Sequence, residues 1–200
     1  MTAYRAPALP PAKGYGVIVA DPAWSFKTYA KDGGNRAAAK HYRVMSAQKI
    51  LDLGRRLGMV DSEGKPIVGL CAKHCALVLW GTWPMLDAAR ATLAAWGFNY
   101  VSGGSWAKRT RRGGLALGTG YIYRGCSEYW LLGTRGKPKV RSHRERNHID
   151  GLRREHSRKP EEILDMHARL FTGPYLELFA RATLPGWDSW GNQVEKFDGR

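Results

Sequence analysis

Short apolar runs alternate with amphipathic segments along the 200 residues of this chain. Apolar runs rich in Val, Ile, Leu and aromatic residues predict strands at 16–20, 76–80, 98–106, 127–132 and 175–180, with a last strand inside 186–193. Helical spacing of apolar positions, with Ser46 and Pro160 at starts and Gly97 at an end, predicts helices at 46–57, 85–96 and 160–170. Strands that alternate with helices predict an α/β fold with a mostly parallel sheet covered by helices.

Polar segments rich in Gly, Lys and Arg separate these elements. Residues 27–40 are expected to form a loop, and residues 108–120 and 136–158 are expected to form two long basic loops that carry function. Residues 1–13, which contain three Pro, are predicted to be a flexible leader. The pattern shows no internal repeat, so residues 14–197 are predicted to form a single domain.

The net charge of the chain indicates a binding partner. The chain has 32 Lys and Arg against 17 Asp and Glu, which gives a net charge of +15. Such an excess favours a polyanion, and nucleic acid is the expected partner because each neutralised phosphate releases counterions. A basic protein without such a partner is the alternative. The excess lies largely in the two basic loops, whose cations include Lys108, Arg109, Arg111, Arg112, Arg141, Arg144, Arg146, Arg153 and Arg154.

Both basic loops are expected at the carboxyl side of the sheet, where their cations would grip phosphates beside the active site; solvated surface loops are the alternative. Other features exclude classes of protein. No apolar stretch is long enough for a membrane span, and no secretory signal is evident, so a cytoplasmic location is expected. Cys71, Cys75 and Cys126 do not form a disulfide framework, and no second ligand pair supports a zinc site.

Asp21-Pro22-Ala23-Trp24 directly follows the first predicted strand. Pro22 ends the strand, so the carboxylate of Asp21 is expected at the carboxyl edge of the sheet, where ligands bind in α/β folds. An aromatic amine is a poor nucleophile, and acceptors for both of its hydrogens favour a pyramidal nitrogen. Asp21 and the Pro22 carbonyl can supply those acceptors, while Trp24 can stack on an extruded base. A strand-ending turn with a core Trp is the equally weighted alternative.

Three further clusters offer polar groups of the kinds that bind a nucleoside-like cofactor. Glu177 and Arg181 lie in and after a short apolar strand, and Asn192 and Gln193 follow a Trp- and Gly-rich turn. Lys159 precedes a predicted helix start, where a carboxylate is favoured. Taken one at a time, an ion-paired strand acid, an ordinary turn and a solvated lysine explain these clusters as well.

Together and in this order, the motifs resemble the DPPW-class adenine N6-methyltransferases, whose best-known members modify messenger RNA. The resemblance runs from about Val17 to Gln193. Besides the Asp21 motif it rests on these segments: Leu77-Val78-Leu79-Trp80, Trp96-Gly97-Phe98, Trp106-Ala107-Lys108, Gly120-Tyr121, Glu128 with Gly133-Thr134-Arg135-Gly136, Arg158-Lys159-Pro160-Glu161-Glu162, Leu176-Glu177-Leu178-Phe179-Ala180-Arg181 and Gly191-Asn192-Gln193.

The resemblance implies a Rossmann-like, S-adenosylmethionine-dependent methyltransferase in which the catalytic motif precedes the cofactor strand. Catalytic roles fall on Asp21, Pro22, Ala23 and Trp24. Tyr42 corresponds to a substrate-facing Tyr, and the first basic loop, with Lys108, Arg109, Arg111 and Arg112, is the expected substrate contact. Cofactor contacts fall on Asp21, Lys159, Glu177, Arg181, Asn192 and Gln193. No metal is expected, because the sulfonium is already an activated methyl donor.

Two positions depart from the family pattern: Ala23 replaces the second Pro of the motif, and Thr183 stands where a His is common. The chain also lacks the long N-terminal extensions of the RNA-modifying members, which favours a compact prokaryotic or phage enzyme acting on DNA. Methylation of adenine N6 in DNA is therefore the leading hypothesis. The same reaction on RNA and an inactive nucleic-acid-binding partner subunit are the alternatives, and the sequence leaves open whether the protein forms a homodimer.

Overall fold

The computed structural model describes residues 11–25, 44–118, 122–155 and 158–198. Its seven strands form one sheet in the order β5-β3-β4-β2-β1-β6-β7. The strands are β1 (Tyr15–Ala20), β2 (Cys71–Gly81), β3 (Asn99–Arg109), β4 (Ser127–Arg135), β5 (His148–Leu152), β6 (Tyr175–Leu178) and β7 (Trp187–Trp190). The helices are α1 (Ala47–Arg56), α2 (Leu86–Ala95) and α3 (Glu162–Leu170), and a 3₁₀ turn (Trp83–Met85) leads into α2.

The sheet is mostly parallel, as predicted. β1 pairs in parallel with β2 and β6, β6 with β7, and β3 with β5, whereas β4 runs antiparallel to both of its neighbours. Because only β4 is reversed, the carboxyl ends of the other six strands lie at one edge of the sheet. We call it the carboxyl edge, and we call the opposite one the amino edge.

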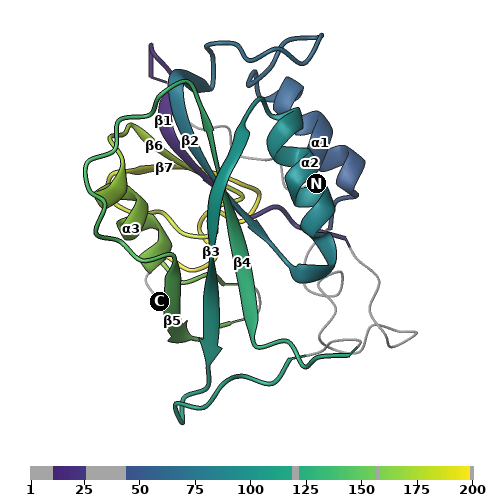
Figure 1. Cartoon of the computed structure of the whole chain (residues 1–200), viewed down its shortest axis with the longest axis vertical. Coiled ribbons are helices and arrows are strands. Elements are labelled where there is room, and N and C mark those ends of the chain that lie inside the picture. Colours follow the sequence, from purple (N-terminus) through teal and green to yellow (C-terminus); the bar gives the residue numbers. More distant parts are fainter. Residues whose placement is uncertain (1–10, 26–43, 119–121, 156–157, 199–200) are drawn as a thin grey trace.

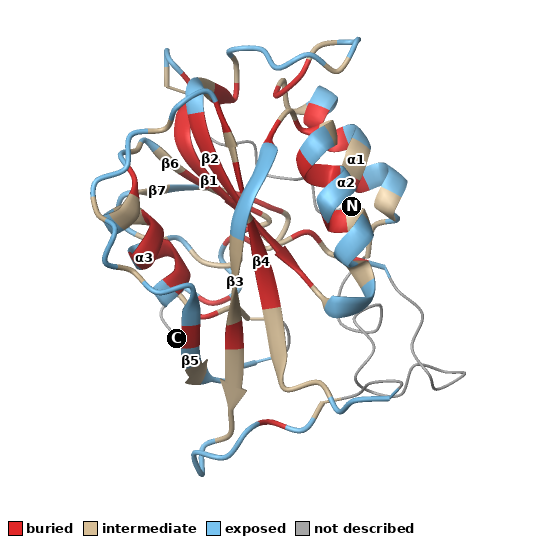
Figure 2. Ribbon diagram, viewed as in Figure 1, coloured by how far each residue is buried: buried red, intermediate tan, exposed pale blue. Residues whose placement is uncertain are grey.

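Helices cover both faces of the sheet: α1 and α2 lie on one side and α3 on the other (Figure 1). Ile18 and Ala20 of β1 face the α1–α2 side, where they join a core with Ile50, Leu93 and Trp96. Val19 faces the α3 side and packs in a second core with Ile163, Leu164 and several Trp residues. Both faces of β1 are therefore dry, which explains why all six of its residues are buried and why its sequence lacks polar alternation (Figure 2).

The three predicted helices and all six predicted strands are confirmed, with small shifts at their ends. The prediction was wrong for residues 136–158, because His148–Leu152 forms β5, which pairs with β3 at the edge of the sheet. A single buried residue, Ile149, leaves this strand without an apolar run that could reveal it. Of the described residues, no helix has the length and apolar character needed to cross a membrane.

The two basic segments do not share one edge of the sheet. Residues 110–118 follow β3 at the carboxyl edge, as expected. Residues 136–147 follow the reversed strand β4, so they start at the amino edge, and Lys137 N donates there to His74 Nδ1 (3.0 Å). Arg153, Arg154 and Arg158, which come after β5, return to the carboxyl edge. The expected position of Arg141, Arg144 and Arg146 beside the active site was therefore wrong.

Candidate active site

Asp21 is the first residue after β1, at the carboxyl edge near the middle of the sheet. Its backbone N–H donates to the carbonyl of Leu178 on β6 (3.3 Å), which extends the pairing of the two strands by one step. Trp24 N–H then donates to the Pro22 carbonyl (2.8 Å), and Met45 N–H donates to the Ala23 carbonyl (2.8 Å). These bonds hold the Asp21–Trp24 turn in place; the Pro22 carbonyl already accepts one hydrogen bond and keeps its second lone pair.

Trp24 is part of the core. It is only 4% exposed, and its indole N–H donates to the Trp80 carbonyl of β2 (2.9 Å). The structure therefore corrects the expectation that Trp24 offers an open face for stacking on a base. Its large buried surface and its hydrogen bond instead anchor the turn that carries Asp21.

A chain of alternating charges runs from Asp21 toward β4 and β3. The Lys159 ammonium lies 2.8 Å and 2.9 Å from the two carboxylate oxygens of Asp21 and 3.2 Å from Glu128 Oε2. The Lys108 ammonium closes the chain at 2.5 Å from Glu128 Oε1. All four side chains are at most about a fifth exposed, so their charges interact in a medium of low effective dielectric.

The lysines determine the charge state of Glu128. Burial alone would raise its pKa, but the two ammonium groups outweigh burial and lower the pKa of Glu128 to about 2. Each lysine also lies over an aromatic ring: the Lys159 ammonium is 5.5 Å from the centroid of Trp80, and the Lys108 ammonium is 5.1 Å from that of Trp106. Glu128 is thus a fixed anion that holds two cations beside Asp21.

On the other side of Asp21, an open cleft leads over β6. Its lining residues are Asp21, Arg158, Lys159, Pro160, Glu161, Ile163, Leu164, Glu177, Phe179, Arg181, Ala182, Leu184 and Phe197. Of the predicted cofactor contacts, Asp21, Lys159, Glu177 and Arg181 meet here. Glu161 precedes the first residue of α3, so this helix end and Lys159 border the same cleft, as expected.

Glu177 has the opposite electrostatic environment to Glu128. Burial, together with the nearby carboxylates of Asp21 and Glu161, raises the pKa of Glu177 to about 8, and Arg181 only partly opposes this shift. The next residue but one, Phe179, has a left-handed backbone (φ 66°), which is unfavourable for a side chain of this size. Its ring stands edge-on to Trp190 at 5.6 Å and borders the cleft.

Asn192 and Gln193 follow β7 at the same edge and are partly buried, but they do not line this cleft. Gly191 brings them close to β6: a Cβ there would lie 2.6 Å from the Ala180 carbonyl, so any larger residue would push the two segments apart. Gln193 Oε1 accepts from Lys196 Nζ (3.2 Å). Their place next to the cofactor strand agrees with the predicted region, and their contacts with a cofactor stay a prediction.

The predicted substrate-contact residues have different roles in the structure. Lys108 belongs to the buried charge chain, and Arg109 makes a two-bond ion pair with Asp150 of β5 (2.6 Å and 2.8 Å). Both cations are therefore paired with carboxylates of the chain. The expectation was that they would be free to bind a phosphate. Arg111 and Arg112 are exposed in the turn after β3. Tyr42 lies outside the described residues.

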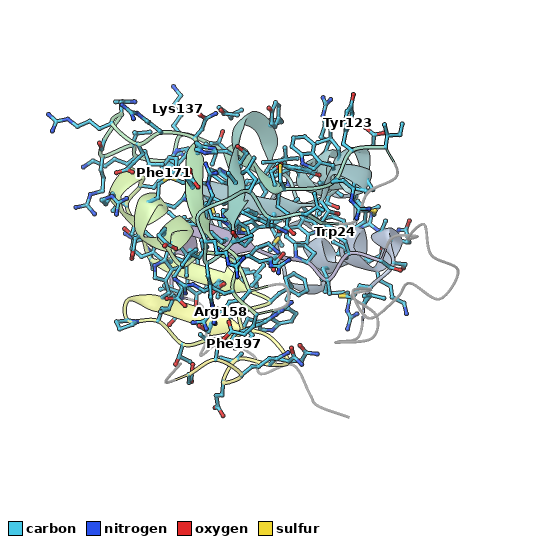
Figure 3. The ribbon with its side chains drawn as sticks, turned by 90° about the horizontal axis from the view of Figure 1, so that it is seen from below. Trp24, Tyr123, Lys137, Arg158, Phe171 and Phe197 are labelled. Carbon is cyan, nitrogen blue, oxygen red and sulfur yellow. The ribbon has the colours of Figure 1, made fainter. Side chains whose placement is uncertain are left out.

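Several site residues escaped prediction. Glu128 is an acid inside a strand, next to the buried Tyr129, and that position is the signal that could have revealed it. Phe197 also lines the cleft, and the Arg158 guanidinium lies over its ring at 4.9 Å (Figure 3). The chain end that supplies Phe197 has no motif that predicts this contact. Among the described residues, no cluster of three or more His, Cys, Asp or Glu could hold a metal ion.

The sequence of this chain is similar to those of known methyltransferases. Residues 15–193 match the family model described as MT-A70. The chain is 31% identical to a putative N(6)-adenosine-methyltransferase MT-A70-like of Medicago truncatula, over 90% of this chain and 26% of that protein. It is 27% identical to the Type II methyltransferase M.MunI of Mycoplasma sp., over 92% and 79%. It is 29% identical to the N6-methyladenosine RNA methyltransferase MTA1 of Cryphonectria parasitica, over 92% and 52%.

The chain thus spans about a quarter of the plant relative and about half of the fungal one, but most of M.MunI. The matched region begins with β1 and ends just after β7, so it contains the whole sheet and both sides of the cleft. MT-A70 methyltransferases use S-adenosylmethionine as methyl donor, and the α/β sheet found here is the Rossmann-like fold expected for them. The chain belongs to the MT-A70 family.

Proposed function

We propose that this protein transfers a methyl group from S-adenosylmethionine to the exocyclic N6 amine of adenine in DNA. The observation that carries the proposal is the position of Asp21: its carboxylate stands at the carboxyl end of a central strand, between the charge chain through Lys159 and the cleft over Glu177. In α/β folds this is the place where ligands bind. The family match supports the reaction class.

The residues around the cleft fit the cofactor. S-adenosylmethionine combines a cationic amino group and sulfonium, a carboxylate, a ribose diol and an adenine ring, and it supplies an activated methyl group when bound. Asp21 and Glu177 offer acceptors for its cationic and hydroxyl groups, and Lys159 and Arg181 offer donors for its carboxylate and ribose oxygens. The apolar members of the lining, Phe179, Leu184 and Phe197, suit an adenine ring.

Asp21 is proposed to accept a hydrogen from the target amine, with the free lone pair of the Pro22 carbonyl as a second acceptor. In the structure both oxygens of Asp21 face the Lys159 ammonium. The Lys159 ammonium must therefore leave at least one oxygen of Asp21 before the carboxylate can accept the amine hydrogen. A carboxylate bound in the cleft would draw Lys159 away from Asp21, and Glu128 keeps the ammonium within reach during that shift. Catalysis would then rest on positioning and electrostatics.

DNA is proposed over RNA because the match covers 79% of M.MunI, a Type II methyltransferase, against 52% of the relative named for RNA. The net charge of +15 suits a nucleic acid of either kind. Methylation of adenine in RNA is the second candidate, and the name of the fungal relative favours it.

Competition between substrates tests the proposal. The purified protein is incubated with S-adenosylmethionine carrying a radiolabelled methyl group, together with DNA and RNA of matched sequence in one reaction. We expect label mainly in DNA. Label mainly in RNA would support the second candidate, and label in neither, with intact cofactor binding, would indicate an inactive partner subunit.

A further inference from the structure

The connection from β4 to β5 carries cations from one edge of the sheet to the other. Residues 136–154 contain seven Lys and Arg but only two acids, Glu145 and Asp150. In Figure 1 this segment leaves the upper end of β4, passes outside α3 and enters β5 near the bottom of the view. It therefore runs along one side of the molecule, from the amino edge toward the candidate active site.

The segment is held at fixed positions along this path. Arg141 N–H donates to the Leu170 carbonyl (2.7 Å) at the end of α3, and Arg169 of that helix binds both oxygens of Glu145 (2.7 Å and 3.0 Å). Asn147 Nδ2 then donates to the Gly103 carbonyl of β3 (3.0 Å). Because backbone and side chains are tied to α3 and β3, the cations in between have defined places on the surface.

Four of these cations are not used in ion pairs within the described parts of the chain. Lys137, Lys139, Arg144 and Arg146 are exposed, and we call them the β4–β5 basic strip. Among the described residues none of the four has an ion-pair partner. Both acids of the segment are already engaged, Glu145 with Arg169 and Asp150 with Arg109. The strip is therefore an uncompensated positive surface.

The far end of the strip lies well away from the candidate active site. Glu128, in the charge chain, and Arg135, just before the strip, are seven residues apart on β4, which corresponds to about 23 Å at ~3.3 Å per residue. With about 3.4 Å between base pairs of a duplex, this distance equals roughly seven base pairs. Lys137 and Lys139 lie beyond that point.

We propose that the β4–β5 basic strip binds the phosphates of double-stranded DNA that flanks the target adenine on one side, with Lys137 and Lys139 more than about seven base pairs away from it. This inference rests on the proposed function for its partner, and it adds a contact outside the active site. It makes a specific demand on substrate length: a duplex with short flanks reaches the cleft but not the far end of the strip at Lys137 and Lys139. The charge of the strip suits phosphates, which need no sequence-specific contacts.

The experiment measures binding to two labelled duplexes with the same central sequence, of about 9 and about 30 base pairs, at several salt concentrations. The strip variant carries Lys137→Gln, Lys139→Gln, Arg144→Gln and Arg146→Gln. The matched control carries Lys49→Gln, Arg55→Gln, Arg56→Gln and Arg90→Gln, which removes the same charge from exposed positions of α1 and α2. Methylation of both duplexes is measured in parallel.

We expect the strip variant to bind the long duplex at least about tenfold more weakly than the wild type, with a salt slope reduced by up to about 3.6. Its affinity for the short duplex should fall much less than that for the long duplex, its methylation of the short duplex at saturating concentration should match that of the wild type, and the control variant should keep the preference for the long duplex. Equal losses on both duplexes, equal losses in the control variant, or no loss would overturn the proposal. Tighter binding of long duplex RNA than of DNA would also contradict it.

The outcome separates this inference from the proposed function. If the wild type methylates both duplexes and the strip variant retains its length preference, only the strip assignment fails. If no adenine is methylated in either duplex, the proposed function fails, and the binding measurement still decides whether the strip contacts DNA.

Discussion

Glu128 and Glu177 are two partly buried glutamates on opposite sides of Asp21, and the structure gives them opposite charge states. Glu128 on β4 lies between Lys108 and Lys159, which lower its pKa to about 2. Glu177 on β6 lies near Asp21 and Glu161, and its pKa is raised to about 8. The same side chain is thus a permanent anion on one side of the site and largely protonated near neutral pH on the other.

The difference indicates a division of tasks. On the Glu128 side every charge has a partner, so this side is rigid and holds Lys159 in place. On the Glu177 side three acids and three cations line the cleft, but at Glu177 itself the carboxylates of Asp21 and Glu161 outweigh Arg181, so a cationic group bound beside Glu177 is favoured. We infer that the Glu177 side is the place for the cofactor and that the Glu128 side positions the groups that act on the amine.

Replacement of Asp21, which joins the two sides, should have the largest effect. Asp21→Ala removes the proposed acceptor of an amine hydrogen, and loss of one such positioned group typically costs about 100- to 1,000-fold in rate. Methyl transfer should fall by at least that factor while cofactor binding stays measurable by calorimetry. Turnover near that of the wild type would contradict the role of Asp21.

Glu128→Gln should mainly affect stability. The change leaves Lys108 and Lys159 next to each other without the buried anion, and loss of one partner in such a network typically costs about 3–5 kcal/mol. Chemical unfolding of the variant and the wild type measures this difference. Asp150→Asn is the control, because it removes an exposed pair with Arg109, which is worth less than about 1 kcal/mol. Equal losses in the two variants would remove the proposed difference between the buried chain and an ordinary surface pair.

Glu177 should make stability depend on pH in the opposite direction to Glu128. The folded-state pKa of about 8 lies above the ordinary value of 4.5, so the folded protein binds the extra proton between these values. Its contribution is fully present below about pH 4.5 and is lost as the pH rises to about 8, by at most about 1.4 kcal/mol per pH unit. For Glu128, stability is instead lost as the pH falls from about 4.5 toward 2.

Unfolding of Glu177→Gln and the wild type at pH 5, 7 and 9 tests this sign. The variant cannot ionise at this position, so its stability relative to the wild type should increase with pH across this range. A constant difference between the two proteins would show that Glu177 does not titrate in the folded state over this interval.

Arg181→Ala and Asn192→Ala should have the smallest effects. Each removes a hydrogen bond proposed for the ribose end of the cofactor, and such losses typically amount to about 1–3 kcal/mol of binding free energy. Cofactor affinity should therefore fall in both variants, while DNA affinity should change little. Unchanged cofactor affinity in both would place the cofactor elsewhere than beside β6.

Sequence patterns identified those parts of the fold in which local signals and tertiary environment agree. The run Val17–Ala20 followed by Pro22 predicted the first strand and its end, because a strand buried on both faces must be continuously apolar. β5 could not be predicted, since an edge strand with one buried residue lacks such a pattern. The antiparallel direction of β4 has no local sequence signal either. Because of this direction the segment after β4 starts at the amino edge, so Arg141, Arg144 and Arg146 do not lie beside the site.

For the site, the family motifs located Asp21, Lys159, Glu177 and Arg181, which the fold brings to one cleft. They did not reveal which cations are already neutralised. Lys108 and Arg109 are close to exposed Arg111 and Arg112 in the sequence, yet the first two bind Glu128 and Asp150, acids that the sheet brings alongside on the neighbouring strands β4 and β5. The burial of Trp24 likewise depends on Trp80, 56 residues away.

Product analysis tests the central claim most directly. DNA is incubated with S-adenosylmethionine and either the wild-type protein or Asp21→Ala, digested to nucleosides and examined by mass spectrometry. The wild type should produce N6-methyl-2′-deoxyadenosine, and the variant should produce little or none. A methyl group on cytosine, or equal amounts of N6-methyl-2′-deoxyadenosine with both proteins, would contradict the account.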